Sequence, residues 1–374
     1  CEGALPFHTS EGLSHYYGVG AYRRPLSDVR HARVRFTPEC LGFSNVPAES
    51  SLGLLPSGAV PAPHHPAWKA GVPRDGGAGW DFEDVRDHYL RELFGVDPVA
   101  LRSVDPARYR ALSRSVTGEL MLRAYAEWRR PESGCGGALV WTLKDLRPGA
   151  GWGIIDSAGQ PKVTLAYLRR AWARRAVLMT DEGLNGVALH LHNEHDQPWT
   201  GSVEVELLRG ARQRIGFAAQ PVTLAPFGTL TLSADALLGT FTDLTHAYRF
   251  GAPKHDVVLA RLREAPVEGR VEGEVVHEDA LFPSGHDLGE HVDGGLSAVA
   301  VEDGRGGVRV TLQSEAFLQC VTSESPGYRP DDDGFHLAPG APRTVIFSPT
   351  AGPIRAFKAW FGAINVDAIL TVRV

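Results

Sequence analysis

Four side chains that could do chemistry stand near the ends of three short apolar runs. The runs are residues 13–19, 34–40 and 138–143, and short apolar runs of this kind are typical of buried parallel strands. His15 and Tyr17 lie in the first run, Glu39 in the second and Trp141 in the third. A carboxylate can act as a nucleophile or base, a hydroxyl or imidazole can orient it, and an indole can support an apolar ligand face.

Each of these residues also has an ordinary structural explanation. A carboxylate at a strand end is more often solvated than catalytic. A large aromatic residue such as Trp141 is commonly part of the core. Packing explains His15 and Tyr17 as well as a functional role does. Residue type and spacing therefore leave the choice open for all four residues.

The second and third runs are separated by a long, mainly helical segment. Its clearest helix is predicted to begin with Asp105 as the N-cap and Pro106 in the first turn. Apolar residues then recur every four positions on one face, which is typical of a helix packed on a core. This stripe consists of Leu112, Val116, Leu120, Ala124 and Trp128.

From about residue 176 onward, the pattern changes to alternating strands separated by Gly, Pro and Asp. The strands recur at the spacing of β-sandwiches, and a glycine-rich stretch at 283–295 divides them into two sets. Two successive sandwiches are therefore predicted. The expected strands include 203–208, 229–233, 256–262, 296–301, 308–312, 344–347 and 368–374.

Composition excludes several classes of protein. The 374 residues carry 38 basic and 44 acidic side chains, a formal net charge of −6, so the basic surplus of a nucleic-acid-binding protein is missing. No apolar run is long enough to span a membrane. Four scattered cysteines indicate reduced thiols rather than a disulfide framework or a zinc site, and the expected location is cytoplasmic. The lack of an initiator Met suggests a fragment or a processed product.

Two sequence landmarks resemble the β-mannosidases of glycoside hydrolase family 2. The first is G-L-S-H-Y-Y-G-V-G-A-Y-R-R-P-L at 12–26, followed by V-R-F-T-P-E-C-L-G-F-S-N-V-P at 34–47. The second is G-A-L-V-W-T-L-K-D-L-R-P-G-A-G-W-G-I-I-D-S-A-G-Q-P-K at 137–162. Both occur in the family's order, about a hundred residues apart, which is far more specific than either alone.

The resemblance implies a multi-domain α/β and all-β protein. Residues 1–175 would be the C-terminal part of a (β/α)8 TIM barrel, with the three apolar runs as its sixth, seventh and eighth strands. Two immunoglobulin-like β-sandwiches would follow, at 176–284 and 285–374. Catalytic groups of such barrels lie at the C-terminal ends of the strands, where the three runs end.

The resemblance also implies roles for the candidate residues. Glu39 would be the catalytic nucleophile, and Trp141 the platform beneath the terminal sugar. Tyr17 and His15 would orient the nucleophile or bind a sugar hydroxyl. Asp145 would contact the sugar, but the family's N-D pair is Lys144-Asp145 here, so a structural ion pair is the alternative. The family's loop tryptophan is Gly20 here, which changes the aromatic lining of the site.

The implied activity is hydrolysis of terminal β-D-mannosyl residues with retention, by double displacement. The substrate would be an oligosaccharide or glycoconjugate with a terminal β-mannose, and no cofactor or metal is expected. The family's acid/base glutamate lies upstream of every residue present, so the chain is expected to be inactive without the missing N-terminal half of the enzyme. Two alternatives remain open. One is another family-2 exo-glycosidase, a β-galactosidase or exo-β-glucosaminidase, and the other is a non-catalytic carbohydrate-binding module.

Overall fold

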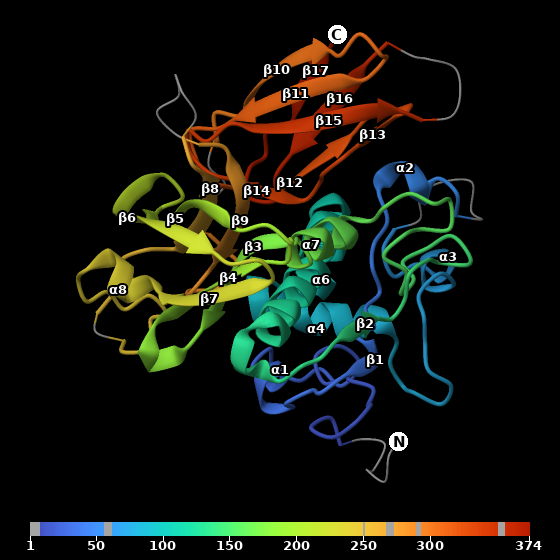
Figure 1. Ribbon diagram of the computed structural model, residues 1–374. Coiled ribbons are helices and arrows are strands. Elements are labelled where there is room, and N and C mark those ends of the chain that lie inside the picture. The colour runs from blue at the N-terminus through green and yellow to red at the C-terminus, as the bar shows by residue number, and fades with distance from the viewer. Residues whose placement is uncertain (1–7, 56–61, 250, 267–272, 289–292, 351–355) are drawn as a thin grey trace.

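The computed structural model describes residues 8–55, 62–249, 251–266, 273–288, 293–350 and 356–374. Helices lie at the centre of the molecule, one set of strands lies beside them, and a second set lies across one end (Figure 1). Among the described residues, no helix is long and apolar enough to cross a lipid bilayer.

The N-terminal part is mainly helical, with two short strands. Helices α1, α4, α5 and α7 pack against α6, the longest helix of this part, whereas α2 and α3 lie on long loops (Figure 1). In chain order the elements are α1 (Asp28–His31), β1 (Thr37–Cys40), α2 (Glu49–Leu52), α3 (Pro66–Lys69), α4 (Phe82–Phe94), α5 (Pro98–Val104), α6 (Pro106–Arg129), a 3-10 turn (Pro131–Ser133), β2 (Ala138–Val140) and α7 (Val163–Ala171).

Helix α6 confirms the prediction made for this segment. The side chain of Asp105 accepts a hydrogen bond from the backbone N–H of Arg108, which satisfies one of the free N–H groups at the helix start. All five residues of the predicted apolar stripe are buried. Gly118 allows α7 to approach closely, since a Cβ there would lie 2.4 Å from a ring carbon of Tyr167.

The two short strands pair in parallel, as predicted for the apolar runs. The first run does not form a strand but joins the same sheet through one parallel bridge, between Tyr16 and Cys40. The prediction that the third run is buried is wrong: it forms only three strand residues, and Leu139 is 58% exposed. A two-stranded sheet does not establish a barrel, so the barrel stays a prediction.

The first set of strands forms two antiparallel sheets that face each other. One sheet has the order β3-β4-β7 and the other β6-β5-β8-β9. Apolar side chains between them form one buried cluster, with Leu189, Val205 and Ala260 fully buried. The strands are β3 (Arg175–Asp181), β4 (Val187–Asn193), β5 (Trp199–Arg209), β6 (Gln213–Leu224), β7 (Gly228–Ser233), β8 (Val257–Glu264) and β9 (Val275–Leu281), with a 3-10 turn (Gly183–Asn185) and helix α8 (Ala234–Leu238) between strands.

The second set repeats this arrangement. Its sheets have the orders β10-β11-β15-β13 and β14-β12-β16-β17, around a core in which Val310, Val345 and Phe361 are fully buried. Both pairs of sheets agree with the predicted sandwiches, whereas the domain limits at 175/176 and 284/285 stay predictions. The strands are β10 (Ser297–Glu302), β11 (Val308–Gln313), β12 (Leu318–Glu324), β13 (Tyr328–Pro330), β14 (Phe335–Leu337), β15 (Arg343–Pro349), β16 (Lys358–Gly362) and β17 (Leu370–Arg373).

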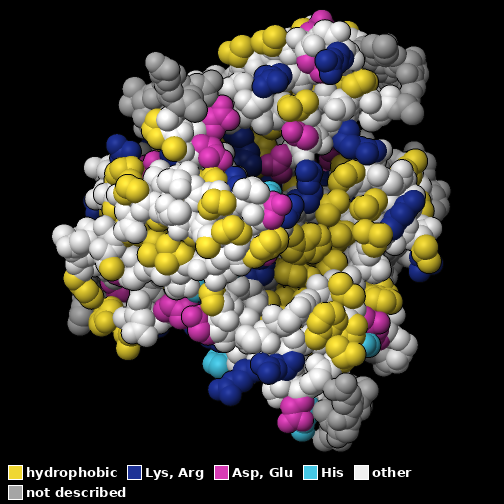
Figure 2. Space-filling view, in the orientation of Figure 1, with side chains coloured by type: hydrophobic (Ala, Val, Ile, Leu, Met, Phe, Trp, Pro, Cys, Tyr) yellow, Lys and Arg dark blue, Asp and Glu magenta, His cyan; other side chains and the backbone are white. Residues whose placement is uncertain are grey.

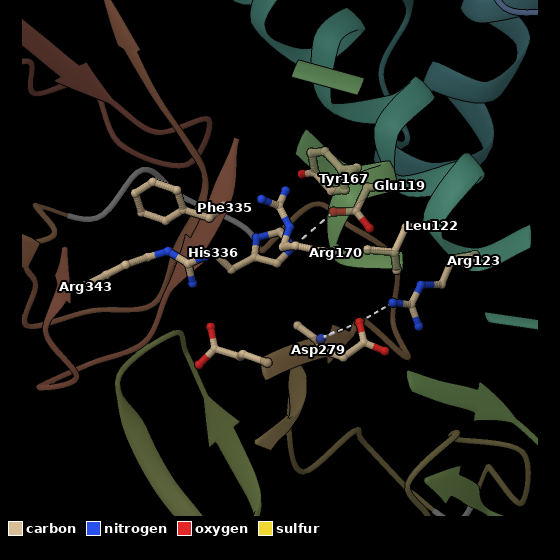
Figure 3. A pocket seen from close by; sticks show the side chains of 11 residues that line it. Glu119, Leu122, Arg123, Tyr167, Arg170, Asp279, Phe335, His336 and Arg343 are labelled. Carbon is tan, nitrogen blue, oxygen red and sulfur yellow. Dashed lines mark hydrogen bonds and ion pairs between the residues drawn. The ribbon is translucent and has the colours of Figure 1, made fainter. Parts of the chain in front are cut away.

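A buried carboxylate links α6 to the second sandwich. Glu119 of α6 is 2% exposed, and its carboxylate lies 3.0 Å from Nε2 of His336 in β14 and 3.6 Å from Nε2 of His286. Figure 3 shows the contact with His336, beside a second polar link in which Arg123 of α6 binds Asp279 of β9. Both links join the helical part to the β-sheets that surround it.

The two imidazoles control the ionisation of Glu119. Burial alone would raise the pKa of this carboxyl, but the hydrogen bond from His336 and the nearby imidazole of His286 outweigh burial and hold the pKa well below the ordinary value. When a carboxyl has a lower pKa in the folded protein than in the unfolded chain, it stabilises the fold. This contribution is fully present at pH values above the unfolded-chain pKa of ~4.3, and it is lost as the pH falls through the folded-state pKa.

We therefore predict that Glu119→Gln lowers the free energy of unfolding at pH 6 by about 1–3 kcal/mol, because a charged hydrogen-bond acceptor is lost from a buried site. The difference from the wild type should shrink as the pH is lowered to about 3.5. Thermal unfolding of both proteins at the two pH values measures this. Glu302→Gln, on an exposed strand position, is the matched control. A difference that does not change with pH would contradict the ionic role of Glu119.

Candidate active site

The structure brings three of the predicted site residues into direct contact. Glu39 lies in β1, and its side chain is 31% exposed. Its Oε2 accepts a hydrogen bond of 2.8 Å from the hydroxyl of Tyr17. The same oxygen lies 3.3 Å from Nδ1 of His15. One carboxylate oxygen therefore has two partners from the segment that lies beside β1.

Backbone hydrogen bonds align this segment with β1. The backbone N–H of Tyr16 donates to the carbonyl of Glu39, at 3.0 Å, and also to Oγ1 of Thr37. The backbone N–H of Leu41 donates to the carbonyl of Tyr16. Because successive side chains of an extended segment point to opposite sides, this register turns Tyr17 toward Glu39 while Tyr16 is buried beneath them.

The environment of Tyr17 keeps its hydroxyl protonated. Burial raises the pKa of Tyr17 well above the ordinary value, and the hydrogen bond to Glu39 and its negative charge raise it further. The phenol is therefore a hydrogen-bond donor at every physiological pH. A fixed donor of this kind can hold a carboxylate in one orientation.

Trp141 follows directly after β2, at the same end of the sheet as Glu39. Its backbone N–H donates to the carbonyl of Cys40, the residue after Glu39, at 2.9 Å, so Trp141 lies beside the end of β1. The indole is only partly buried. It meets the ring of Trp152 edge to face, with 6.0 Å between the ring centroids.

Asp145 has the ion pair that was the alternative to a sugar contact. Its Oδ2 lies 2.6 Å from Nζ of Lys162, and both side chains are buried. The Asp145 Oδ1 accepts from the backbone N–H of Gly153, at 2.7 Å. Lys162 also donates to the carbonyl of Asn45, at 2.7 Å. The pair ties the loops after β1 and β2 together, while a sugar contact by Asp145 stays a prediction.

Trp152 was not among the predicted site residues. Its ring lies between Trp141 and Phe82, and its Nε1 is buried without a hydrogen-bond partner among the described residues. Trp152 falls in the second sequence landmark, so the sequence itself contains a signal for this residue.

Hydrophobic side chains gather on the surface in the hollow between the central helices and the loops that carry α2 and α3 (Figure 2). The described residues on and after β2 include three exposed leucines: Leu139, Leu143 and Leu146. Exposed apolar surface of this kind commonly marks a contact with another part of a protein or with a ligand.

Comparison with proteins of known sequence points to one enzyme class. β-Mannosidase B of Aspergillus niger is 27% identical over 299 residues, which are 71% of this chain and 32% of the relative. β-Mannosidase B of Neosartorya fischeri is 25% identical over 285 residues, with the same coverage. The resemblance to the family-2 β-mannosidases is confirmed. No protein-family model matches the chain.

Solved structures show the same fold. The chain is similar to a β-D-mannosidase from Dictyoglomus thermophilum, with a TM-score of 0.76 at 13% identity over 95% of this chain and 40% of that one. It is also similar to an exo-chitosanase from Amycolatopsis orientalis, with a TM-score of 0.61 at 14% identity over 91% of this chain and 43% of the other. The chain thus spans about a third of the length of its curated β-mannosidase relatives.

The buried pair of Asp145 and Lys162 can be tested through stability. We predict that Asp145→Asn lowers the free energy of unfolding by about 3–5 kcal/mol, because it leaves a buried ammonium without its counter-charge. Urea unfolding measures the loss. The double variant Asp145→Asn/Lys162→Met should recover part of it, since no unpaired charge remains.

An exposed ion pair provides the control. Arg24, whose side chain is 62% exposed, binds Asp28 at the surface, so Arg24→Gln should cost about 0–1 kcal/mol. A loss of that small size for Asp145→Asn would show that the buried pair does not hold the loops.

Proposed function

We propose that this chain belongs to a retaining exo-glycosidase that hydrolyses terminal β-D-mannosyl residues, with Glu39 as the nucleophile. The observation that carries the proposal is the Glu39 carboxylate, partly exposed near the end of β1, held by Tyr17 and His15, and at the same end of the sheet as Trp141. The similarity to β-mannosidases supports the choice of sugar.

The proposed reaction has two displacements. In the first, a Glu39 oxygen attacks the anomeric carbon and forms a glycosyl ester, while the bond to the leaving oxygen breaks and an acid carboxyl gives that oxygen a proton. In the second, the same carboxyl takes a proton from water, the water oxygen attacks the anomeric carbon, and Glu39 leaves as a carboxylate. Tyr17 would hold the Glu39 carboxylate in position, and Trp141 would carry the apolar face of the sugar ring.

The acid carboxyl must lie about 5–5.5 Å from the nucleophile in a retaining enzyme. We infer that it comes from the part of the relatives that this chain does not match. The same part would extend the parallel sheet of β1 and β2 into a (β/α)8 barrel and cover the apolar surface near β2. An edge strand and an exposed apolar patch are both expected where further strands pack.

A second candidate is an exo-glycosidase with another sugar specificity. The structural similarity to an exo-chitosanase favours it, because sugar identity depends on loops around a shared framework. A panel of nitrophenyl glycosides assayed on the complete enzyme would separate the two candidates. Faster turnover of a β-glucosaminide than of a β-mannoside would favour the second candidate over a β-mannosidase.

We predict that Glu39→Gln in the complete enzyme lowers kcat by several orders of magnitude, because an amide cannot form the glycosyl ester. Circular dichroism should show an unchanged fold. Azide added to Glu39→Ala should restore turnover and yield a glycosyl azide of inverted configuration, since a small anion then attacks the anomeric carbon directly. More than a tenth of the normal activity in Glu39→Gln would remove Glu39 from the mechanism.

We further predict that the purified 374-residue chain does not turn over a β-mannoside at a measurable rate. General acid assistance is typically worth about 10²- to 10⁴-fold, and contacts to the sugar from the missing strands would be lost as well. An assay with nitrophenyl β-D-mannoside tests this. Turnover by the purified chain would show that it contains its own acid/base group.

A further inference from the structure

A cavity lies at the junction of the helical part and the second sandwich. Its volume is about 120 Å³, against about 10–15 Å³ for a single water molecule. It is bounded by the residues before and in α2, by the start of α7, and by β12, β13 and the loop that follows β13. None of the five predicted site residues lines it, although Lys162, the partner of Asp145, does.

We propose that this cavity is a binding site for one pyranose ring of a neutral oligosaccharide, separate from the site around Glu39. The nature of the ligand follows from the lining side chains. The choice of a mannose oligosaccharide as the probe rests on the proposed function.

The charges of the lining nearly balance, which favours a neutral ligand. The side chains of Asp331, Asp332, Asp333 and Glu324 are acidic, and those of Lys162, Arg169 and Arg329 are basic. Several are already paired: Asp332 binds Arg170, at 2.8 Å, and Lys162 binds Asp145. A phosphate or an amine would leave one set of these charges uncompensated, whereas sugar hydroxyls can donate to carboxylates and accept from guanidinium groups.

Two carboxyl groups are held in place at the cavity by backbone groups. Oε1 of Glu324 accepts from the backbone N–H of Glu49, at 2.9 Å, and Oδ1 of Asp333 accepts from the backbone N–H of Ser323, at 2.8 Å. Because these bonds fix each carboxyl at one oxygen, little side-chain entropy would be lost when a ligand binds. A pair of pre-oriented acceptors suits neighbouring hydroxyls on one ring.

The protonation state of Asp333 adds to the kinds of hydrogen bond that the cavity can offer a ligand. Burial, together with the negative charges of Asp332 and Glu324, raises the pKa of Asp333 to about 7. Its carboxyl is therefore partly protonated near neutral pH and can donate to a sugar oxygen as well as accept from a hydroxyl.

An aromatic ring completes the site. Tyr328 of β13 is partly buried, and its ring meets Phe357 edge to face, with 5.1 Å between the centroids. The contact fixes the ring without stacking on it. Leu165 and Pro330 add further apolar surface. Sugar sites combine such apolar surface with a few convergent polar groups.

The test is isothermal titration calorimetry, in which β-1,4-linked mannotriose is titrated into the 374-residue chain. Saturable binding is expected. Tyr328→Ala should weaken binding at least tenfold, because the apolar platform is lost, while Tyr328→Phe should retain it. Arg329→Gln changes an exposed side chain of the lining without removing core packing, and should weaken binding at least threefold even if Tyr328→Ala fails to fold.

Two controls locate the binding. Arg373→Gln replaces an exposed arginine of β17, outside the lining, and should bind as the wild type does. Trp141→Ala removes the sugar platform of the proposed active site, so it should weaken only the binding that occurs at that site. Loss of binding in Trp141→Ala with full binding in Tyr328→Ala and Arg329→Gln would overturn the second site and support the site around Glu39. No binding by the wild type would also overturn the second site, while the Glu39→Gln assay of the complete enzyme would still test the proposed function by itself.

Discussion

The structure depends on helix α6, because this helix buries charged groups that must each find a partner elsewhere in the chain. Arg114 donates to the carbonyl of Pro47, Glu119 meets two histidines of the second sandwich and its linker, and Arg123 binds Asp279 of the first sandwich. A buried charge without a partner costs several kcal/mol. The three contacts therefore fix how the loop after β1 and both sandwiches lie around a single helix.

The same arrangement sets the positions of both sites. The loop that Arg114 holds, residues 41–48, begins directly after β1, which carries Glu39, and reaches the wall of the cavity at Ala48. The other wall belongs to the second sandwich, which Glu119 holds through His336. A cavity between two parts of a chain is a stable binding site only if their relative position is fixed, and here buried ionic contacts of α6 fix it.

Three side chains form the predicted active site through the pairing of two short extended segments. Tyr17 reaches Glu39 because Tyr16 is hydrogen-bonded to β1 in one register. A shift of one residue would turn Tyr17 to the opposite side. The loops beyond β1 and β2 are joined by the buried pair of Asp145 and Lys162. This part of the site therefore needs both local strand pairing and long-range ionic contacts.

The sequence by itself determined the long helix with its cap at Asp105, the change to strands near residue 176, and the resemblance to β-mannosidases, because these depend on local periodicity and on motifs that lie in continuous segments. It also placed Glu39 and Trp141 near strand ends, whereas the run that holds Tyr17 forms only a single bridge to β1. Only the tertiary structure decided that Tyr17 and His15 share one oxygen of Glu39, that Asp145 is buried against Lys162, and that Trp152 packs on Trp141. These contacts join residues far apart in the chain, and their geometry depends on register and packing, which no local pattern specifies.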